Sequence, residues 1–451
     1  MVKNSKQTTA SPQLAIINPH TAGIDVGSML MMVAYTDSDG HQHLMETDGF
    51  TESLDELAKT LQCEGVTHVA MEATGVYWIA LYEVLEQHGL VVTLINPKHF
   101  KNVDAQKTDV KDCQWLQQLH AHGLLRASHI APEAYRELKS YLHERNVLQQ
   151  QKSDTLNRIH RLLTQMNIKV QHLISDIEGV SGMKLLRSIA QGISDPVALL
   201  SQIDVTKLKA EREDLLKSLT GAYKEQYILI LQHALKAYDF FKMQMKSYEG
   251  LIEGVLKKML PENETGSTPV IPLKKGFVRK NQYHINLKEY FRHIIGVDVT
   301  QIEGLDEIST LEIISVTGID MNKWPSAEHF TSWLNLSPRP KITGGKIIGY
   351  QKRFTNNKAT QAFRMAAQTM WKHKGALGQL YRRLAAQKGS KKAIKAIARR
   401  LAVIFYTIVK YKKEYDKRRL QIDAEKQQLR KIARLKKEAL KYGLILQTAM
   451  A

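Results

Sequence analysis

The sequence predicts a mixed α/β domain at the N-terminus, followed by a mostly helical remainder. Between residues 14 and 125, short apolar runs alternate with helical patterns, whereas after Pro132 the apolar residues recur at helical spacing. The length of 451 residues also exceeds what one compact core usually holds. We therefore expect two or three domains, the first ending near residue 130.

The N-terminal elements follow a defined order. Short apolar or alternating runs, ended by turn residues, predict strands at Gly23–Gly27, Leu30–Thr36, Gly40–Asp48, Val66–Glu72 and Val91–Asn96. Helical spacing predicts helices at Leu54–Gln62, Val76–Gln87 and Lys107–His122. Three antiparallel strands followed by strand, helix, strand and helix is the order of a ribonuclease-H-like α/β fold.

The helical remainder contains one regular apolar stripe. Spacings of three and four predict a coiled-coil seam of about three heptads, made by Leu156, Ile159, Leu163, Met166, Val170, Leu173 and Ile177. A long helix packed within its own domain is the alternative. We expect a linker at Pro261–Lys275, a Pro/Gly-rich loop between two helices at Ser337–Gly349, and a basic helix after Asp416.

The charge of the chain is unevenly distributed. The net charge is +19, but residues 336–451 hold 30 Lys/Arg and 5 Asp/Glu, so this part carries +25 and residues 1–335 carry −6. A basic C-terminal quarter predicts a polyanionic partner, nucleic acid first. No apolar run approaches the roughly 18 residues of a membrane span. With two cysteines and no apolar signal region, we expect a cytoplasmic protein that contacts no membrane.

Four carboxylates occupy positions that suggest a shared function. Asp25 lies inside an apolar strand, and Glu72 ends another one before a glycine turn. Asp109 and Asp112 are three residues apart, which places both on one helix face. Four acids meeting at one sheet edge would repel each other, and a bound Mg²⁺ is the natural way to offset their negative charge. The alternative, for each acid taken by itself, is a helix cap or a solvated residue. Asp109 in particular could cap the helix that begins near it.

The segment "GIDVGS" has a rival interpretation. A similar strand and glycine turn opens actin-like ATPases and sugar kinases. Those proteins need a second Asp–Gly phosphate turn near the middle of the chain, which the sequence does not offer convincingly, and no Walker A pattern occurs. The kinase interpretation is therefore disfavoured.

The basic part contains a candidate phosphate loop, Thr343-Gly344-Gly345-Lys346. Two glycines allow close backbone approach, Lys346 adds charge, and the hydroxyl of Thr343 is a candidate nucleophile. An ordinary turn is the alternative for so short a motif. We expect nucleic-acid binding by Gly344, Gly345 and Lys346, and by the basic residues Arg353, Lys358, Arg364, Arg382 and Arg383. Trp333, Tyr350, Phe354 and Trp371 could stack on bases or pack internally.

The motifs at both ends resemble one family. "GIDVGS", "MEATGVYW", "INPKHFKN" and "KTDVKDCQWLQQL" near the N-terminus, and "GVDVTQIEGLD", "WPSAEHFTSWLNLSP", "ITGGK" and "FRMAAQ" later, are similar to transposases of insertion-sequence family 110, subgroup 1111, which are related to Piv-type DNA invertases. The resemblance covers about residues 20–445. It implies a disordered segment at 1–19, a RuvC-like DEDD domain at 20–130, a coiled-coil connector at 131–300, a transposase domain at 301–415 and a basic helical tail at 416–451.

The resemblance also implies a mechanism. The DEDD tetrad falls on Asp25, Glu72, Asp109 and Asp112, and a serine of a Ser-Gly-Gly-Lys loop attacks DNA and forms a transient phosphoserine link. It further implies a noncoding bridge RNA that selects the DNA, and a homo-oligomer, dimer or tetramer, in which two protomers share a site. Here the nucleophile position is Thr343, whose extra methyl restricts χ1. Ser337 is a weaker candidate.

Three functions are consistent with the sequence. The first is a Mg²⁺-dependent DNA recombinase that excises and integrates an insertion sequence through a hydroxyl nucleophile. The second is a RuvC-like structure-selective endonuclease that activates water. The third is a catalytically inactive nucleic-acid-binding derivative of a transposase.

Overall fold

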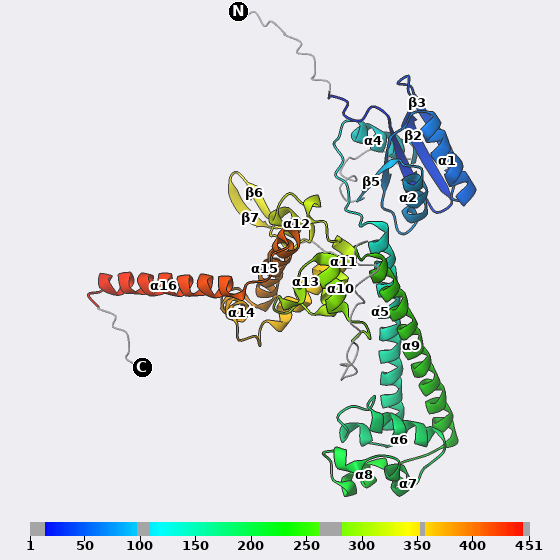
Figure 1. The fold of residues 1–451 in the computed structure, drawn as a ribbon, viewed down its shortest axis with the longest axis vertical. Coiled ribbons are helices and arrows are strands. Elements are labelled where there is room, and N and C mark those ends of the chain that lie inside the picture. The colour runs from blue at the N-terminus through cyan, green and yellow to red at the C-terminus, as the bar shows by residue number, and fades with distance from the viewer. Residues whose placement is uncertain (1–13, 97–108, 262–281, 352–356, 445–451) are drawn as a thin grey trace, which may run out of the picture. The chain divides into compact units, whose positions relative to one another are not determined.

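The computed structural model of the chain describes residues 14–96, 109–261, 282–351 and 357–444 (Figure 1). The chain divides into two compact units, Met1–Ile130 and Ala131–Ala451, each of which is described by itself. The expected linker at Pro261–Lys275 lies outside the described residues apart from Pro261. Of the segment 1–19, expected to be disordered, residues 14–19 are described, and the backbone amides of Ile17 and Asn18 donate to the carbonyl of Ala121.

The described part of the first unit contains a five-stranded sheet in the order β3-β2-β1-β4-β5. Strands β1, β2 and β3 are antiparallel neighbours, whereas β4 and β5 run parallel to β1. The elements are β1 (Thr21–Val26), β2 (Leu30–Thr36), β3 (Gln42–Asp48), α1 (Thr51–Cys63), β4 (His68–Glu72), α2 (Trp78–Gln87), β5 (Val91–Ile95) and α4 (Asp109–Ala121). As far as they are described, the strands and helices predicted between residues 23 and 122 are confirmed to within three residues, and the mixed α/β fold with them.

Alternation along β1 assigns a different set of helices to each face of the sheet. Ala22, Ile24 and Val26 point to a core shared with α1 and α2. Gly23 lies between them and faces α4, where an added Cβ would be 2.4 Å from the carbonyl oxygen of Cys113 and from the amide nitrogen of Gln117. A glycine is therefore what lets α4 lie directly on β1.

The second unit begins with two long helices, α5 (Glu133–Gln165) and α9 (Glu225–Lys258), which lie side by side (Figure 1). A buried ion pair joins the two helices, between Arg145 of α5 and Glu249 of α9 at 2.7 Å. Lys152 of α5 pairs at 3.0 Å with Glu178, which lies just before α6. Shorter helices join the far ends of the pair: η1 (Val170–His172), α6 (Val180–Ala190), α7 (Pro196–Ser201), η2 (Val205–Lys207) and α8 (Arg212–Leu219).

The predicted coiled-coil seam from Leu156 to Ile177 is wrong as a continuous helix. Helix α5 ends at Gln165, and Asn167 adopts a positive φ of 56°. The seam residues instead fill one intrachain core with α6, α7, α8 and α9, and Ile159, Leu163 and Met166 are fully buried. Heptad spacing indicates that a stripe of residues is buried, but it does not indicate whether the same chain or another chain covers that stripe. These residues therefore pack within the chain.

A second helical core follows, which α5 and α9 share. It contains α10 (Leu287–Ile295), η4 (Val299–Gln301), α11 (Glu307–Thr317), η5 (Met321–Lys323), α12 (Ala327–Trp333), α13 (Lys358–Thr369), α14 (Ala376–Lys388) and α15 (Ser390–Tyr411). Leu138 of α5 and Ile252 of α9 are buried in it, so the expected boundary at residue 300 does not separate two cores. Helix α16 (Lys417–Lys441) follows, and none of the described helices is long and apolar enough to span a bilayer.

The Pro/Gly-rich segment between α12 and α13 is not the loop that the sequence predicted. Strands β6 (Pro340–Thr343) and β7 (Lys346–Tyr350) form an antiparallel hairpin, which we call the Thr343 hairpin. Strands of four and five residues, flanked by proline and broken by glycines, are too short to produce a strand pattern in the sequence.

Candidate functional site

Two of the four predicted acids lie at the carboxyl ends of neighbouring parallel strands. The printed register of β1 and β4 pairs Gly23 with Ala70 and Ile24 with Met71, so the next residues along are Asp25 and Glu72. Parallel neighbours lie about 4.8 Å apart, and residues in register point to the same face. Asp25 and Glu72 therefore lie side by side, on the face that α4 covers. Both are partly buried.

Helix α4 brings a third acid to the same edge. Its middle lies over Gly23, and the ring of His120 near its end is 6.2 Å from the ring of His68 at the start of β4. The first turns of α4 therefore lie over the carboxyl ends of β1 and β4, and Asp112 belongs to them. We call Asp25, Glu72 and Asp112 the acidic edge. Asp109 is the first residue of α4, and its side chain is outside the described part of the structure.

The pKa of Cys113 reflects the negative charges at this edge. Burial, together with the negative charges of Asp25 and Asp112, raises the pKa of its thiol to about 11. Both carboxylates therefore act on one buried group from opposite elements. Carboxylate oxygens suit a hard cation such as Mg²⁺. Among the described side chains, no three His, Cys, Asp or Glu groups are arranged closely enough to hold a metal ion by themselves.

The Thr343 hairpin is closed by a two-residue turn. Gly344 and Gly345 have φ values of 55° and 75°, and Thr343 pairs with Lys346 across the turn. Positive φ at both central residues is the geometry of a type I′ turn, which matches the natural twist of strands. The turn therefore needs residues that tolerate positive φ, which the two glycines do, and it places Thr343 at the exposed tip.

The two faces of this hairpin differ in chemistry. Residues paired across the strands share a face, and a bulge at Ile348 preserves this order. One face carries Lys341, Thr343 and Lys346, all exposed. The other carries Pro340, Ile342, Ile347 and Tyr350, and the last three are about 60% exposed. The hydroxyl of Thr343 thus lies between two cations, on the face opposite the isoleucines.

Ser337, the weaker candidate nucleophile, is in a different environment. Its hydroxyl lies 3.0 Å from that of Thr331, which is fully buried at the end of α12. This contact ties Ser337 to the helical body, whereas Thr343 lies at the tip of an exposed ribbon. The geometry favours Thr343.

The predicted nucleic-acid contacts fall into three groups. Gly344, Gly345, Lys346, Arg364 and Arg383 are exposed or lie on the exposed turn. Two others have a structural role: Arg382 donates to the carbonyls of Trp371 and His373, and the charge of Lys358 acts on Glu312. Arg353, like Phe354, lies outside the described residues.

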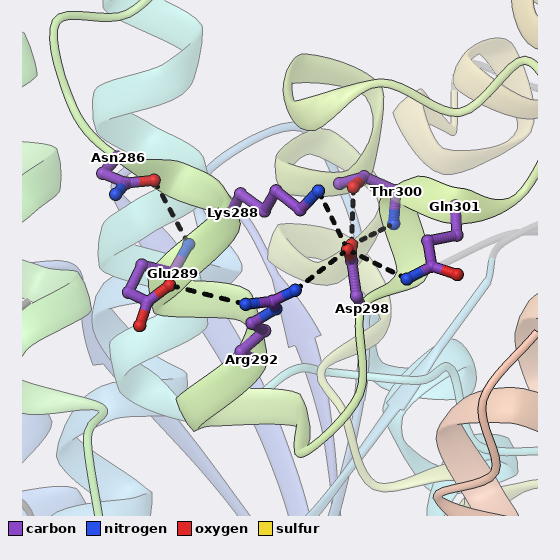
Figure 2. A network of polar contacts seen from close by, with 7 residues as sticks. All are labelled: Asn286, Lys288, Glu289, Arg292, Asp298, Thr300 and Gln301. Atoms are coloured by element: carbon purple, nitrogen blue, oxygen red, sulfur yellow. Dashed lines mark hydrogen bonds and ion pairs between the residues drawn. The ribbon is translucent and has the colours of Figure 1, made fainter. Parts of the chain in front are cut away.

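Sequence reasoning gave no role to Asp298, a carboxylate buried within the helical body. It accepts hydrogen bonds from the backbone and hydroxyl of Thr300 and lies 3.1 Å from Lys288 and 3.9 Å from Arg292 (Figure 2). Burial alone would raise its pKa, but the hydrogen bonds of Thr300 and Lys288 hold it below the usual value. Asp298 therefore joins α10 to η4. An apolar "GVDV" context was the only signal in the sequence.

Two models of known protein families match the chain. Residues 22–168 match a transposase family model of the DEDD IS110 type, and residues 298–382 match the model of the transposase IS116/IS110/IS902 family. The first match contains the sheet and α4, and the second begins at Asp298 and contains the Thr343 hairpin. No curated protein matches the chain.

Proposed function

We propose that this chain, which carries two transposase domains of the IS110 type, excises and integrates an insertion sequence through its acidic edge and the hydroxyl of Thr343. Transposase function follows from the two domains. The observation that supports the chemistry best is the in-register placement of Asp25 and Glu72 at one strand end, with Asp112 over it. Three acids that meet on one face suit the handling of a phosphodiester and its counter-ion.

In this proposal Asp25, Glu72 and Asp112, together with Asp109, would hold Mg²⁺, because carboxylate oxygens are the ligands that this ion prefers. When bound, the ion would offset the negative charge of the scissile phosphate. The chain's own part is to orient the phosphate: Lys341 and Lys346 flank Thr343 on one face of the hairpin and bind the non-bridging oxygens. These two cations also lower the cost of bringing the hydroxyl to an anion.

The proposed bond changes are as follows. The Thr343 oxygen bonds to phosphorus while the bond from phosphorus to the 3′-oxygen breaks. The threonine proton passes to a carboxylate of the acidic edge, and the departing 3′-oxygen takes up a proton. The downstream strand is then held to Thr343 through its 5′-phosphate. Attack by a 3′-hydroxyl of the partner DNA reverses these changes, releases Thr343 and completes the exchange.

The choice of DNA and the assembly belong to the same proposal. By resemblance we propose a bridge RNA that selects donor and target, and an oligomer in which the acidic edge of one protomer serves the Thr343 hairpin of another. The stretch from residue 329 to 413 supports binding to nucleic acids, because it holds 20 Lys/Arg and no Asp/Glu. We call it the acid-free stretch.

The test is to trap the covalent adduct. DNA from the ends of the element, labelled on the downstream strand, is incubated with the RNA transcribed beside the gene and Mg²⁺, then denatured. Wild-type protein and Ser337→Ala are expected to retain label on the protein, whereas Thr343→Ala and Asp25→Ala retain none and still bind DNA. An adduct mapped to another residue would refute the role of Thr343.

Two other results of this experiment would favour the two alternative functions. Strand cleavage by Thr343→Ala at the wild-type rate, without any adduct, would identify a RuvC-like endonuclease that activates water. Tight DNA or RNA binding that does not depend on Mg²⁺, with no cleavage by wild-type protein, would identify an inactive derivative.

A further inference from the structure

The exposed tryptophan of the acid-free stretch has an unusual setting. Of the aromatic residues that the sequence offered for base stacking, Trp333 packs against Trp324 and Phe330 in the helical core. Trp371 does not: 54% of it is exposed, at the turn between α13 and α14. A solvent-exposed indole loses hydration favourably when something covers it. The question is what covers Trp371.

The turn that carries Trp371 is held in place. Arg382 of α14 donates to the carbonyl of Trp371 at 3.1 Å and to that of His373 at 2.8 Å, and the amide of Gly375 donates to the ring of His373. The adjacent residue Met370 is buried. A fixed backbone beneath an exposed ring loses little conformational entropy on binding, which is what a preformed binding surface requires.

The charge around this ring selects the class of partner. The Nζ of Lys372 lies 4.7 Å from the centre of the indole ring, and Lys374 and Arg364 are exposed nearby in the sequence. The acid-free stretch supplies no carboxylate to neutralise these cations. A polyanion is therefore the complementary partner, and nucleic acids are the polyanions that also present flat π-faces.

We infer that Trp371 is a stacking platform for an unpaired base of single-stranded nucleic acid, with Lys372 on the adjacent phosphate. This inference rests on the proposed nucleic-acid function and adds the form of the ligand. Inside a duplex each base face is covered by its neighbours, whereas an unpaired base offers a free face on which an indole can stack. A recombinase must handle such bases where strands are exchanged.

The experiment compares two ligands of equal charge. Full-length protein is titrated with fluorescent oligothymidylate of about 12 nucleotides, within the usual site size, and with an abasic strand of the same length. Wild-type protein is expected to bind the oligothymidylate about 5- to 100-fold more tightly, which is the usual range for one stacked base. Trp371→Leu should lose this preference and bind the abasic strand as wild type does, and Trp371→Phe should keep part of it.

Two controls separate stacking from charge and from folding. Trp115→Leu makes the same change at an exposed tryptophan of the first unit and should leave the preference intact. Lys372→Gln should weaken binding to both strands equally and lower the salt slope by about 0.7. Circular dichroism checks that each variant folds.

The outcomes are distinct. An intact base preference in Trp371→Leu overturns the platform, and so does equal binding of the two strands by wild-type protein. Tighter binding of anionic lipid vesicles than of oligothymidylate, lost in Trp371→Leu, would assign the indole to a membrane surface and overturn it too. Absence of binding to any nucleic acid would instead refute the proposed function itself.

Discussion

Gly23 of β1 lies so close beneath Cys113 of α4 that a Cβ on Gly23 would be 2.4 Å from the Cys113 carbonyl oxygen. Both groups are backbone, so neither can rotate away. We expect Gly23→Ala to displace α4 from the sheet and to lower the free energy of unfolding of the first unit by about 1–3 kcal/mol, the usual cost of overpacking. Because Asp112 moves with α4, the rate of DNA strand cleavage should fall even under conditions where the variant is fully folded. Urea unfolding and a cleavage assay measure both.

Gly250→Ala is the matched control. Gly250 is a helical glycine of α9 with open space beside its Cα. Alanine is favoured over glycine in a helix interior by about 1 kcal/mol, so this variant should be as stable as wild type or more stable. Equal stability of Gly23→Ala and wild type would show that α4 does not need the close approach.

The turn of the Thr343 hairpin gives a second prediction. Gly344 has a φ of 55°, which asparagine tolerates and β-branched residues do not. We expect Gly344→Asn to keep the hairpin and to form the covalent adduct near the wild-type rate. Gly344→Val should lose the turn and reduce adduct formation by at least tenfold, because Thr343 is then no longer held between Lys341 and Lys346. Adduct yield over time is the measurement, and equal yields of the two variants would contradict the role of the turn.

The strands that hold the acids were predictable and the hairpin was not, for one physical reason. Buried strands such as Ala22–Val26 must be continuously apolar, so Asp25 stands out against its neighbours. The Thr343 hairpin is exposed on both faces, so no burial pattern marks its strands. Only the pair Gly344–Gly345 marks the turn, and two glycines are equally compatible with a loop.

The misassigned seam has a different cause. Leu156 to Ile177 showed correct heptad spacing, and the residues are buried as expected. The chain turns away from the helix axis at Asn167, and the carbonyl of the preceding Met166 accepts a hydrogen bond from the amide of Ala222. That partner lies more than fifty residues further along the chain. Periodicity therefore predicted burial, but a contact distant in sequence determined how the chain achieves it.

Asp298 gives a third prediction, on stability. Asp298→Asn keeps the shape of the side chain but removes the charge that Lys288 and Arg292 approach. We expect the free energy of unfolding of the second unit to fall by about 1.5–3 kcal/mol, the usual value for hydrogen bonds to a charged group. The folded pKa of Asp298 is depressed, so its contribution is present above the unfolded pKa and is lost as the pH falls towards the folded value. The difference between variant and wild type should therefore shrink in acid, and urea midpoints at pH 7 and pH 3.5 test this.

His120 gives the last prediction, on pH. Burial, together with the nearby imidazole of His68, lowers its pKa to about 4, and its Nε2 has no hydrogen-bond partner within the described structure. The unfolded chain binds a proton near pH 6.5, whereas the folded chain does so only near pH 4. Stability of the first unit should therefore fall as the pH is lowered from 6.5 towards 4. His120→Leu removes both the proton site and the unsatisfied nitrogen, so it should be more stable than wild type at pH 5 and lose less stability between pH 7 and pH 5. Tryptophan fluorescence during urea unfolding follows the transition, and His172→Leu, at an exposed histidine of the second unit, is the control. If His120→Leu and wild type lose the same stability over this range, His120 is not the group responsible.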